Sequence, residues 1–146
     1  MAIIHSPAIR WHGDRLELLD QRALPLESRW LSYASAEDTA HAIRDMVVRG
    51  APAIGITAAY GVVLAARALG AKASLASLQP AFDVLAASRP TAVNLFWALH
   101  RMQAVCQLQG EALIEQLSAE AVQIHQDDRD MNHRLAEFGA ALLPAD

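Results

Sequence analysis

Two short segments carry residues suited to holding an anion, and the first is Arg49-Gly50-Ala51-Pro52-Ala53. Gly50 is typical of a helix end and Pro52 of a first helical turn, so one helix is expected to end here and the next to begin at once. The N–H groups of Gly50, Ala51 and Ala53 then lie near a helix N-terminus, where unpaired donors and the helix dipole attract negative charge. Arg49 adds a forked, permanently charged donor.

The second segment has the same layout. In Ser88-Arg89-Pro90-Thr91-Ala92-Val93-Asn94, an arginine again precedes a proline and the expected start of a helix. Thr91 can cap that helix or donate a hydrogen bond. Two arginines at two helix N-termini could therefore converge on one phosphate. Arg-Gly and Arg-Pro pairs are also common at helix boundaries, so a purely structural capping role stays open beside the anion site.

The elements that position these segments follow from the apolar pattern. Between residues 8 and 34 apolar residues tend to alternate, and Gly13 suits a hairpin turn, which predicts a small antiparallel sheet. From Ser35 onward the pattern is helical. The expected helices run from about residue 36 to Gly50, Ala51 to Gly70, Ser74 to Ala87, Thr91 to Gln109 and Glu111 to about Asp128, and a further apolar stripe comprises Met131, Leu135, Phe138 and Leu142 before Pro144. The predicted fold class is α+β and mainly α, a sheet over 8–34 followed by a helical bundle over 36–143.

Composition supports one helical domain. Of the 146 residues 53% are hydrophobic and only 5% aromatic, while about a fifth are alanine, the strongest helix former and well above ordinary usage. The net charge is −4 and the basic residues are scattered, which argues against nucleic-acid binding. The longest uncharged run, Ala51 to Ala66, is short for a membrane span and favours a buried helix. A single cysteine and an N-terminus unlike a signal peptide favour a cytoplasmic protein.

Other reactive side chains favour structural roles. Cys106 is expected to be a buried thiol in the middle of a helix. His125 and Asp128, spaced i and i+3, could belong to a metal site, but a solvated helix end is the preferred interpretation and no metal is expected. Phe96 and Trp97 are expected to lie in the core or at an interface between domains rather than in a ligand wall.

Both arginine segments resemble the S-methyl-5-thioribose-1-phosphate isomerase family of methionine salvage. The resemblance rests on two runs, Arg49-Gly50-Ala51-Pro52-Ala53-Ile54-Gly55 with Ala58-Ala59-Tyr60-Gly61 after it and Ser88-Arg89-Pro90-Thr91-Ala92-Val93-Asn94-Leu95. It extends to the opening hairpin at Ile9-Arg10-Trp11. The wider group includes the regulatory subunits of translation initiation factor 2B and ribose-1,5-bisphosphate isomerase.

This resemblance implies an aldose-ketose isomerase that converts methylthioribose 1-phosphate into methylthioribulose 1-phosphate without an organic cofactor. It assigns substrate binding to Arg49, Gly50, Ala51 and Arg89. Because the phosphate is on the anomeric carbon, the sugar cannot open as a free aldose does. The enzyme must therefore hold the phosphate while protons or a hydride move between C1 and C2. The resemblance also implies a homodimer for the full-length protein.

The family's catalytic motifs are not found in this sequence. Its catalytic cysteine lies in a Thr-His-Cys-Asn type motif and its catalytic aspartate lies further on, both in a C-terminal Rossmann-like domain. Residues 1–146 are therefore expected to be a single N-terminal domain, with no catalytic residue of their own and no isomerase activity when alone. That C-terminal domain is their expected partner. The alternative is a sugar-phosphate-sensing or regulatory module related to the initiation factor 2B subunits.

Overall fold

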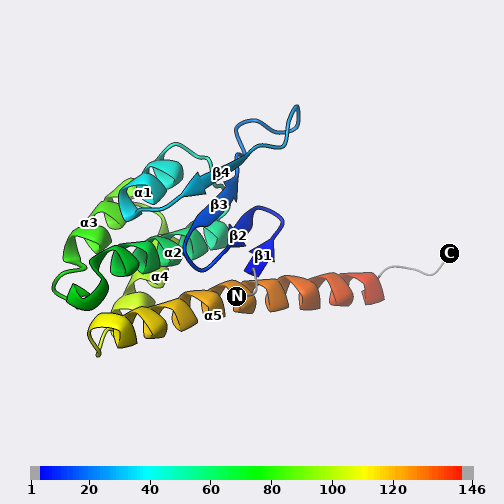
Figure 1. Cartoon of the computed structure of the whole chain (residues 1–146). Coiled ribbons are helices and arrows are strands. Elements are labelled where there is room, and N and C mark those ends of the chain that lie inside the picture. Colours follow the sequence, from blue (N-terminus) through cyan, green and yellow to red (C-terminus); the bar gives the residue numbers. More distant parts are fainter. Residues whose placement is uncertain (1–3, 143–146) are drawn as a thin grey trace.

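The computed structural model describes residues 4–142, which form a small sheet followed by a helical bundle (Figure 1). This confirms the predicted fold class. The strands are β1 (Ile4–Ser6), β2 (Ile9–Trp11), β3 (Leu16–Leu19) and β4 (Trp30–Tyr33). The helices are α1 (Ala36–Arg44), α2 (Ala51–Leu69), the short 3-10 helix η1 (Gly70–Lys72), α3 (Gln79–Ser88), α4 (Val93–Ala104) and α5 (Gly110–Leu142). The expected end of the last helix near Pro144 lies outside the described residues.

The sheet is antiparallel with the order β1-β2-β3-β4. The alternation that predicted it is visible in burial, because Ile9 and Leu18 pair across β2 and β3 and both lie in the core. Gly13 turns the hairpin with φ of 93°, as expected. Strand β1 extends the sheet to Ile4, four residues before the predicted start. Its three residues were too few to show an alternating pattern.

Helix α2 is the centre of the bundle. It packs against α1, α3, α4, α5 and strand β2, which explains why its sequence is apolar almost all round. Within the described residues, Ala51–Lys72 is the one helical segment long and apolar enough to cross a membrane, but 67% of its apolar window is buried inside the structure. The prediction of a buried helix is confirmed.

Several helix boundaries differ from prediction. Helix α1 ends at Arg44 rather than Gly50, since Met46 takes a left-handed conformation with φ of 65°. Helix α3 begins at Gln79 rather than Ser74, with Pro80 in its first turn. Helix α4 ends at Ala104, and Gly110 begins the next helix instead of ending this one.

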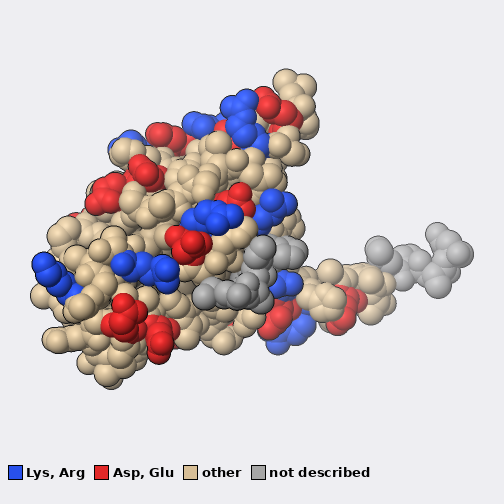
Figure 2. All heavy atoms as spheres, in the orientation of Figure 1, with Lys and Arg blue, Asp and Glu red and all other residues tan. Residues whose placement is uncertain are grey.

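Charged groups of both signs alternate over the surface. Figure 2 shows acidic and basic side chains interspersed on the face in view.

Helix α5 continues unbroken through the expected boundary near Asp128 and extends beyond the rest of the body (Figure 1).

A buried polar cluster joins α5 to the centre of the fold. Tyr60 of α2 stacks on Trp11 with ring centroids 4.5 Å apart, and a hydrogen bond of 2.7 Å joins its hydroxyl to Nδ1 of His125. Nε2 of His125 lies 3.0 Å from Oγ of Ser6, at the end of β1. His125 is 0% exposed, so the interpretation of this segment as a solvated helix end is wrong at His125. One imidazole thus links a strand and two helices.

Changing Tyr60 to Phe should lower the free energy of unfolding by about 1–3 kcal/mol, because it removes one partner of a buried hydrogen bond and leaves the other in place. Urea denaturation followed by circular dichroism measures the change. Tyr33→Phe is the matched control, since that ring is only partly buried. Equal stabilities of the Tyr60→Phe variant and the original protein would contradict the role given to this bond.

Helices α2 and α4 approach closely at Gly55. A Cβ added to Gly55 would lie 2.9 Å from the backbone carbonyl oxygen of Asn94 and 3.4 Å from Cβ of Ala98. Backbone atoms cannot move aside as a flexible side chain can, so the absence of a side chain at Gly55 allows this crossing. The contact fixes the first turn of α4 against the first turns of α2.

We expect Gly55→Ala to destabilise the protein by about 1–3 kcal/mol, through overpacking at this crossing. Gly139→Ala is the control, because Gly139 is helical and a Cβ there would meet nothing within 4 Å. That variant should gain about 0.5–1 kcal/mol from improved helix propensity. Thermal and urea unfolding of both variants test the contrast, and a Gly55→Ala protein as stable as Gly139→Ala would refute the steric argument.

Candidate functional site

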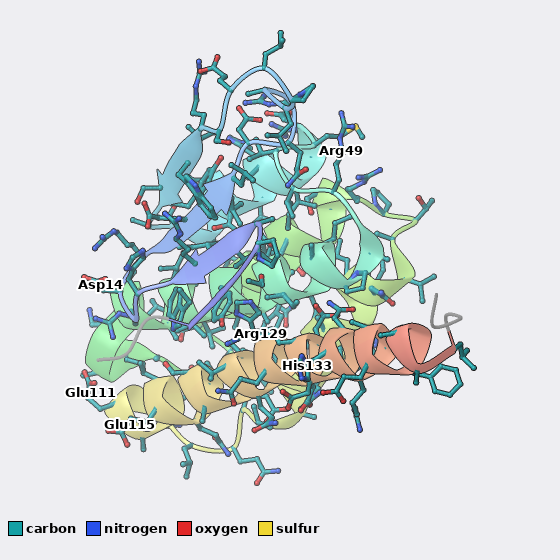
Figure 3. The ribbon with its side chains drawn as sticks, turned by 90° about the vertical axis from the view of Figure 1, so that its right-hand side faces the viewer. Asp14, Arg49, Glu111, Glu115, Arg129 and His133 are labelled. Atoms are coloured by element: carbon teal, nitrogen blue, oxygen red, sulfur yellow. The ribbon has the colours of Figure 1, made fainter. Side chains whose placement is uncertain are left out.

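The loop over residues 45–50 presents Arg49. Val47 and Val48 are buried, and the carbonyl of Val47 accepts a hydrogen bond of 2.9 Å from the N–H of Gln21. This contact ties the loop to the chain that follows β3. Arg49 comes next and is exposed. In Figure 3 it projects from the opposite side of the body to Glu111 and Glu115 on α5.

Gly50 begins helix α2 in a conformation that suits glycine alone. Its φ is 91° and its ψ 133°, and a Cβ there would meet nothing within 4 Å, so backbone geometry and not crowding requires the glycine. The first bond into the helix runs from the N–H of Ile54 to the carbonyl of Gly50 at 3.0 Å. The N–H groups of Ala51 and Ala53 precede it and carry the positive end of the helix dipole.

The second arginine segment forms a similar helix start. Arg89 follows the end of α3, and the N–H of Ala92 donates to the carbonyl of Arg89 at 3.0 Å, which turns the chain toward α4. Ala92 is the N-cap of α4 and its side chain forms no capping bond. The N-terminus of α4 therefore also has unpaired donors.

Both helix starts border one cavity of about 420 Å³, which we call the arginine cavity. It contains all four residues assigned from sequence to substrate binding, namely Arg49, Gly50, Ala51 and Arg89. The remaining lining residues are Met46, Ile54, Thr91, Ala92, Val93 and Asn94. Sequence reasoning gave no site role to Met46, which has a left-handed conformation in the loop before Arg49. It named Asn94 as part of the second arginine segment without giving it a role of its own.

The arginine cavity is electrically positive. Of the described residues that line it, only Arg49 and Arg89 are charged. Among residues 4–142, neither guanidinium has a carboxylate within 4.0 Å. Unpaired arginines beside two helix N-termini are suited to binding a phosphate.

A second cavity, of about 310 Å³, is lined by both residues of the close contact, Gly55 and Asn94, and we call it the tryptophan cavity. Asn94 borders both cavities. The other residues that line it are Pro52, Gly55, Ile56, Trp97, Ile124, Asp127, Asp128 and Met131. Most of its lining residues are apolar, and its charged groups are the carboxylates of Asp127 and Asp128, in contrast to the arginines of the first cavity.

Cys106 and the acidic residues of α5 do not form a reactive centre in the described structure. Cys106 is half-buried and lies just after α4, not in the middle of a helix as expected; its Sγ donates to the carbonyl of Met102 at 3.4 Å. Burial raises the pKa of its thiol, which disfavours the nucleophilic thiolate. Within residues 4–142 there is no group of three or more His, Cys, Asp or Glu side chains placed to hold a metal ion.

Comparison with known proteins identifies close relatives. The chain is 56% identical over 143 residues to methylthioribose-1-phosphate isomerase of Alcanivorax borkumensis, a match covering 97% of this chain and 41% of that protein. It is 53% identical over 140 residues to the Pseudomonas aeruginosa protein of the same name, covering 93% and 39%. The chain thus spans about two fifths of the length of these relatives.

Solved structures show the same fold. A 5-methylthioribose 1-phosphate isomerase from Pyrococcus horikoshii matches with a TM-score of 0.88 and 33% identity, over 99% of this chain and 45% of that one. The translation initiation factor eIF-2B delta subunit from A. fulgidus matches with a TM-score of 0.79 and 33% identity, over 97% and 41%.

The model of the Initiation factor 2 subunit family matches residues 47–146, a segment that includes both arginine segments and all of the helices after α1. The chain is also a homologue of the methylthioribose-1-phosphate isomerases, as its resemblance to them indicated. By its sequence and its fold, the chain belongs to the Initiation factor 2 subunit family.

Proposed function

We propose that this chain is the substrate-anchoring part of an aldose-ketose isomerase that converts methylthioribose 1-phosphate into methylthioribulose 1-phosphate. The observation that carries the proposal is the arginine cavity, where Arg49 and Arg89 meet two helix N-termini. Such a site holds a phosphate dianion by charge-assisted hydrogen bonds and by aligned backbone dipoles. The names of the relatives supply the identity of the sugar.

The reaction explains why a firm hold on the phosphate matters. The bond between C1 and the ring oxygen must break and the released oxygen must gain a proton. A hydrogen must move from C2 to C1, and the C2 hydroxyl must lose its proton as C2 becomes a carbonyl. The phosphate stays on C1 throughout. Anchoring it fixes C1 and C2 relative to the groups that move the hydrogen, which lowers the entropic part of the barrier.

The arginine cavity binds and does not itself transfer protons in this proposal. In the part of the chain that the structure describes, none of its lining residues is an Asp, Glu, His or Cys, the usual general acids and bases. We assign the catalytic acid-base groups to the additional C-terminal domain of the longer relatives. The outer part of α5, where Leu135, Phe138 and Leu142 are 62–68% exposed, offers that domain an apolar surface. Dimerisation of the full-length protein belongs to the same proposal.

A regulatory role is the second candidate, and the similarity to the A. fulgidus eIF-2B delta subunit supports it. In that case the arginine cavity would sense a sugar phosphate without turnover. Assays of the protein extended to the length of its relatives distinguish the two functions, since only the isomerase would produce the ketose.

Arg49→Ala and Arg89→Ala should each weaken binding of methylthioribose 1-phosphate by about 10- to 100-fold, the loss expected for a charged hydrogen-bond donor. Isothermal titration calorimetry on the 146-residue chain measures this. Arg67→Ala, at the opposite end of α2, is the control and should bind normally. In the extended protein the Arg49 and Arg89 variants should also show a raised KM. An unchanged Kd and KM would instead support a purely structural role for both arginines.

The 146-residue chain alone should bind the sugar phosphate without isomerising it, because its anchoring residues lack an acid-base partner in the cavity. Nuclear magnetic resonance of the sugar after prolonged incubation detects any ketose. Turnover by a preparation whose intact mass matches 146 residues, and whose Arg49→Ala form is inactive, would overturn this assignment.

A further inference from the structure

The two cavities are arranged to receive the two ends of one small molecule. Both lie at the starts of α2 and α4, and they are neighbours because Asn94 lines both. Successive residues in the first turns of α2 divide between them, since Ala51 and Ile54 line the arginine cavity while Pro52 and Gly55 line the tryptophan cavity. A ligand of sugar size passing beside Asn94 can therefore contact both.

Electrostatics gives such a ligand one orientation. The arginine cavity carries two unpaired cations, whereas the tryptophan cavity has the carboxylates of Asp127 and Asp128. Arg101 lies 3.6 Å from the Asp127 carboxylate, and no cation lies within 4.0 Å of the Asp128 carboxylate among the described residues. A phosphate is attracted to the first cavity and repelled from the second. The uncharged end of the ligand is left for the tryptophan cavity.

The walls of the tryptophan cavity suit a soft apolar group. Trp97 is 52% exposed and stands under the guanidinium of Arg101, which lies 5.4 Å from its ring centroid. Met131 is 54% exposed and adds a flexible, polarizable thioether, while Ile56 and Ile124 supply buried aliphatic surface. Sulfur makes favourable contacts with aromatic rings, so a thioether is better matched to these walls than a hydroxyl.

We propose that the tryptophan cavity binds the methylthio group of the sugar phosphate and selects this sugar over ribose 1-phosphate, which has a hydroxyl at the same carbon. This inference rests on the proposed function, because it needs the phosphate to lie in the arginine cavity. It gives Trp97 a role as a ligand wall, where the sequence favoured core or an interface between domains. Trp97 and Met131 are specificity-determining residues in this proposal.

The role of the tryptophan cavity is tested by calorimetry on the 146-residue chain, which measures the Kd of methylthioribose 1-phosphate and of ribose 1-phosphate. The original chain should bind the methylthio sugar about tenfold more tightly, as expected when a cavity buries one small apolar group. Trp97→Ala and Met131→Ala should weaken binding of the methylthio sugar but not of ribose 1-phosphate. The ratio of the two Kd values should then come close to one. Both side chains are half-exposed, so their loss leaves the core intact.

Two control variants separate this inference from the proposed function. Phe138→Ala removes an exposed aromatic ring on α5 that lies outside both cavities, and it should keep the tenfold ratio. Arg49→Ala should weaken the binding of both sugars by the same factor, so the ratio of their Kd values should stay tenfold. A nuclear Overhauser effect between the S-methyl protons and the indole of Trp97 provides direct evidence of contact.

The possible failures are distinguishable. Equal affinities of the original chain for the two sugars, or a ratio unchanged by Trp97→Ala, would overturn the role of the tryptophan cavity while leaving the arginine site in place. Kd values that are unchanged by Arg49→Ala and Arg89→Ala would overturn the proposed function, and the inference with it. If the chain binds neither sugar, the proposed function and the inference are both overturned.

Discussion

The close approach of α2 to the first turn of α4 is the constraint on which both cavities depend. The carbonyl of Asn94 lies where a side chain at position 55 would stand, so the two helices cross with no side chain between them. This crossing sets the distance between the two helix starts. Arg49 precedes one start and Arg89 precedes the other, and both line one cavity. A wider crossing would separate the arginines and divide the positive potential that attracts an anion.

Burial of α2 explains why the proposed anion site lies at its beginning. A helix surrounded by four others can meet solvent and ligands chiefly at its ends. At the N-terminal end the exposed groups are N–H donors, and the alanines around them leave the backbone accessible to a ligand. The alanine-rich sequence therefore serves both helix packing and access to the backbone.

The sequence predicted those parts that obey local rules. Alternation revealed the hairpin between Ile9 and Leu18, and continuous apolar character revealed the buried α2, because both patterns follow from the geometry of a single element. The two arginine segments were found in the same way. The early end of α1 was not predictable, since the loop around Val47 is held by the N–H of Gln21 from a distant turn. The burial of His125 was missed for a similar reason, as its partner Ser6 is 119 residues away.

The periodicity of a sequence predicts which face of a helix is apolar, but it does not predict what covers that face. Helix α5 is an example. Its first half buries Leu117, Ala121 and Ile124 in the core, whereas its outer half exposes Leu135 and Phe138 with the same spacing. The tryptophan cavity lies at the change between the two halves, with buried Ile124 on one side and exposed Met131 on the other. The proposed ligand wall therefore joins a buried residue of the core to an exposed residue of the surface. That combination gives a small apolar group both a fixed contour and a route of entry.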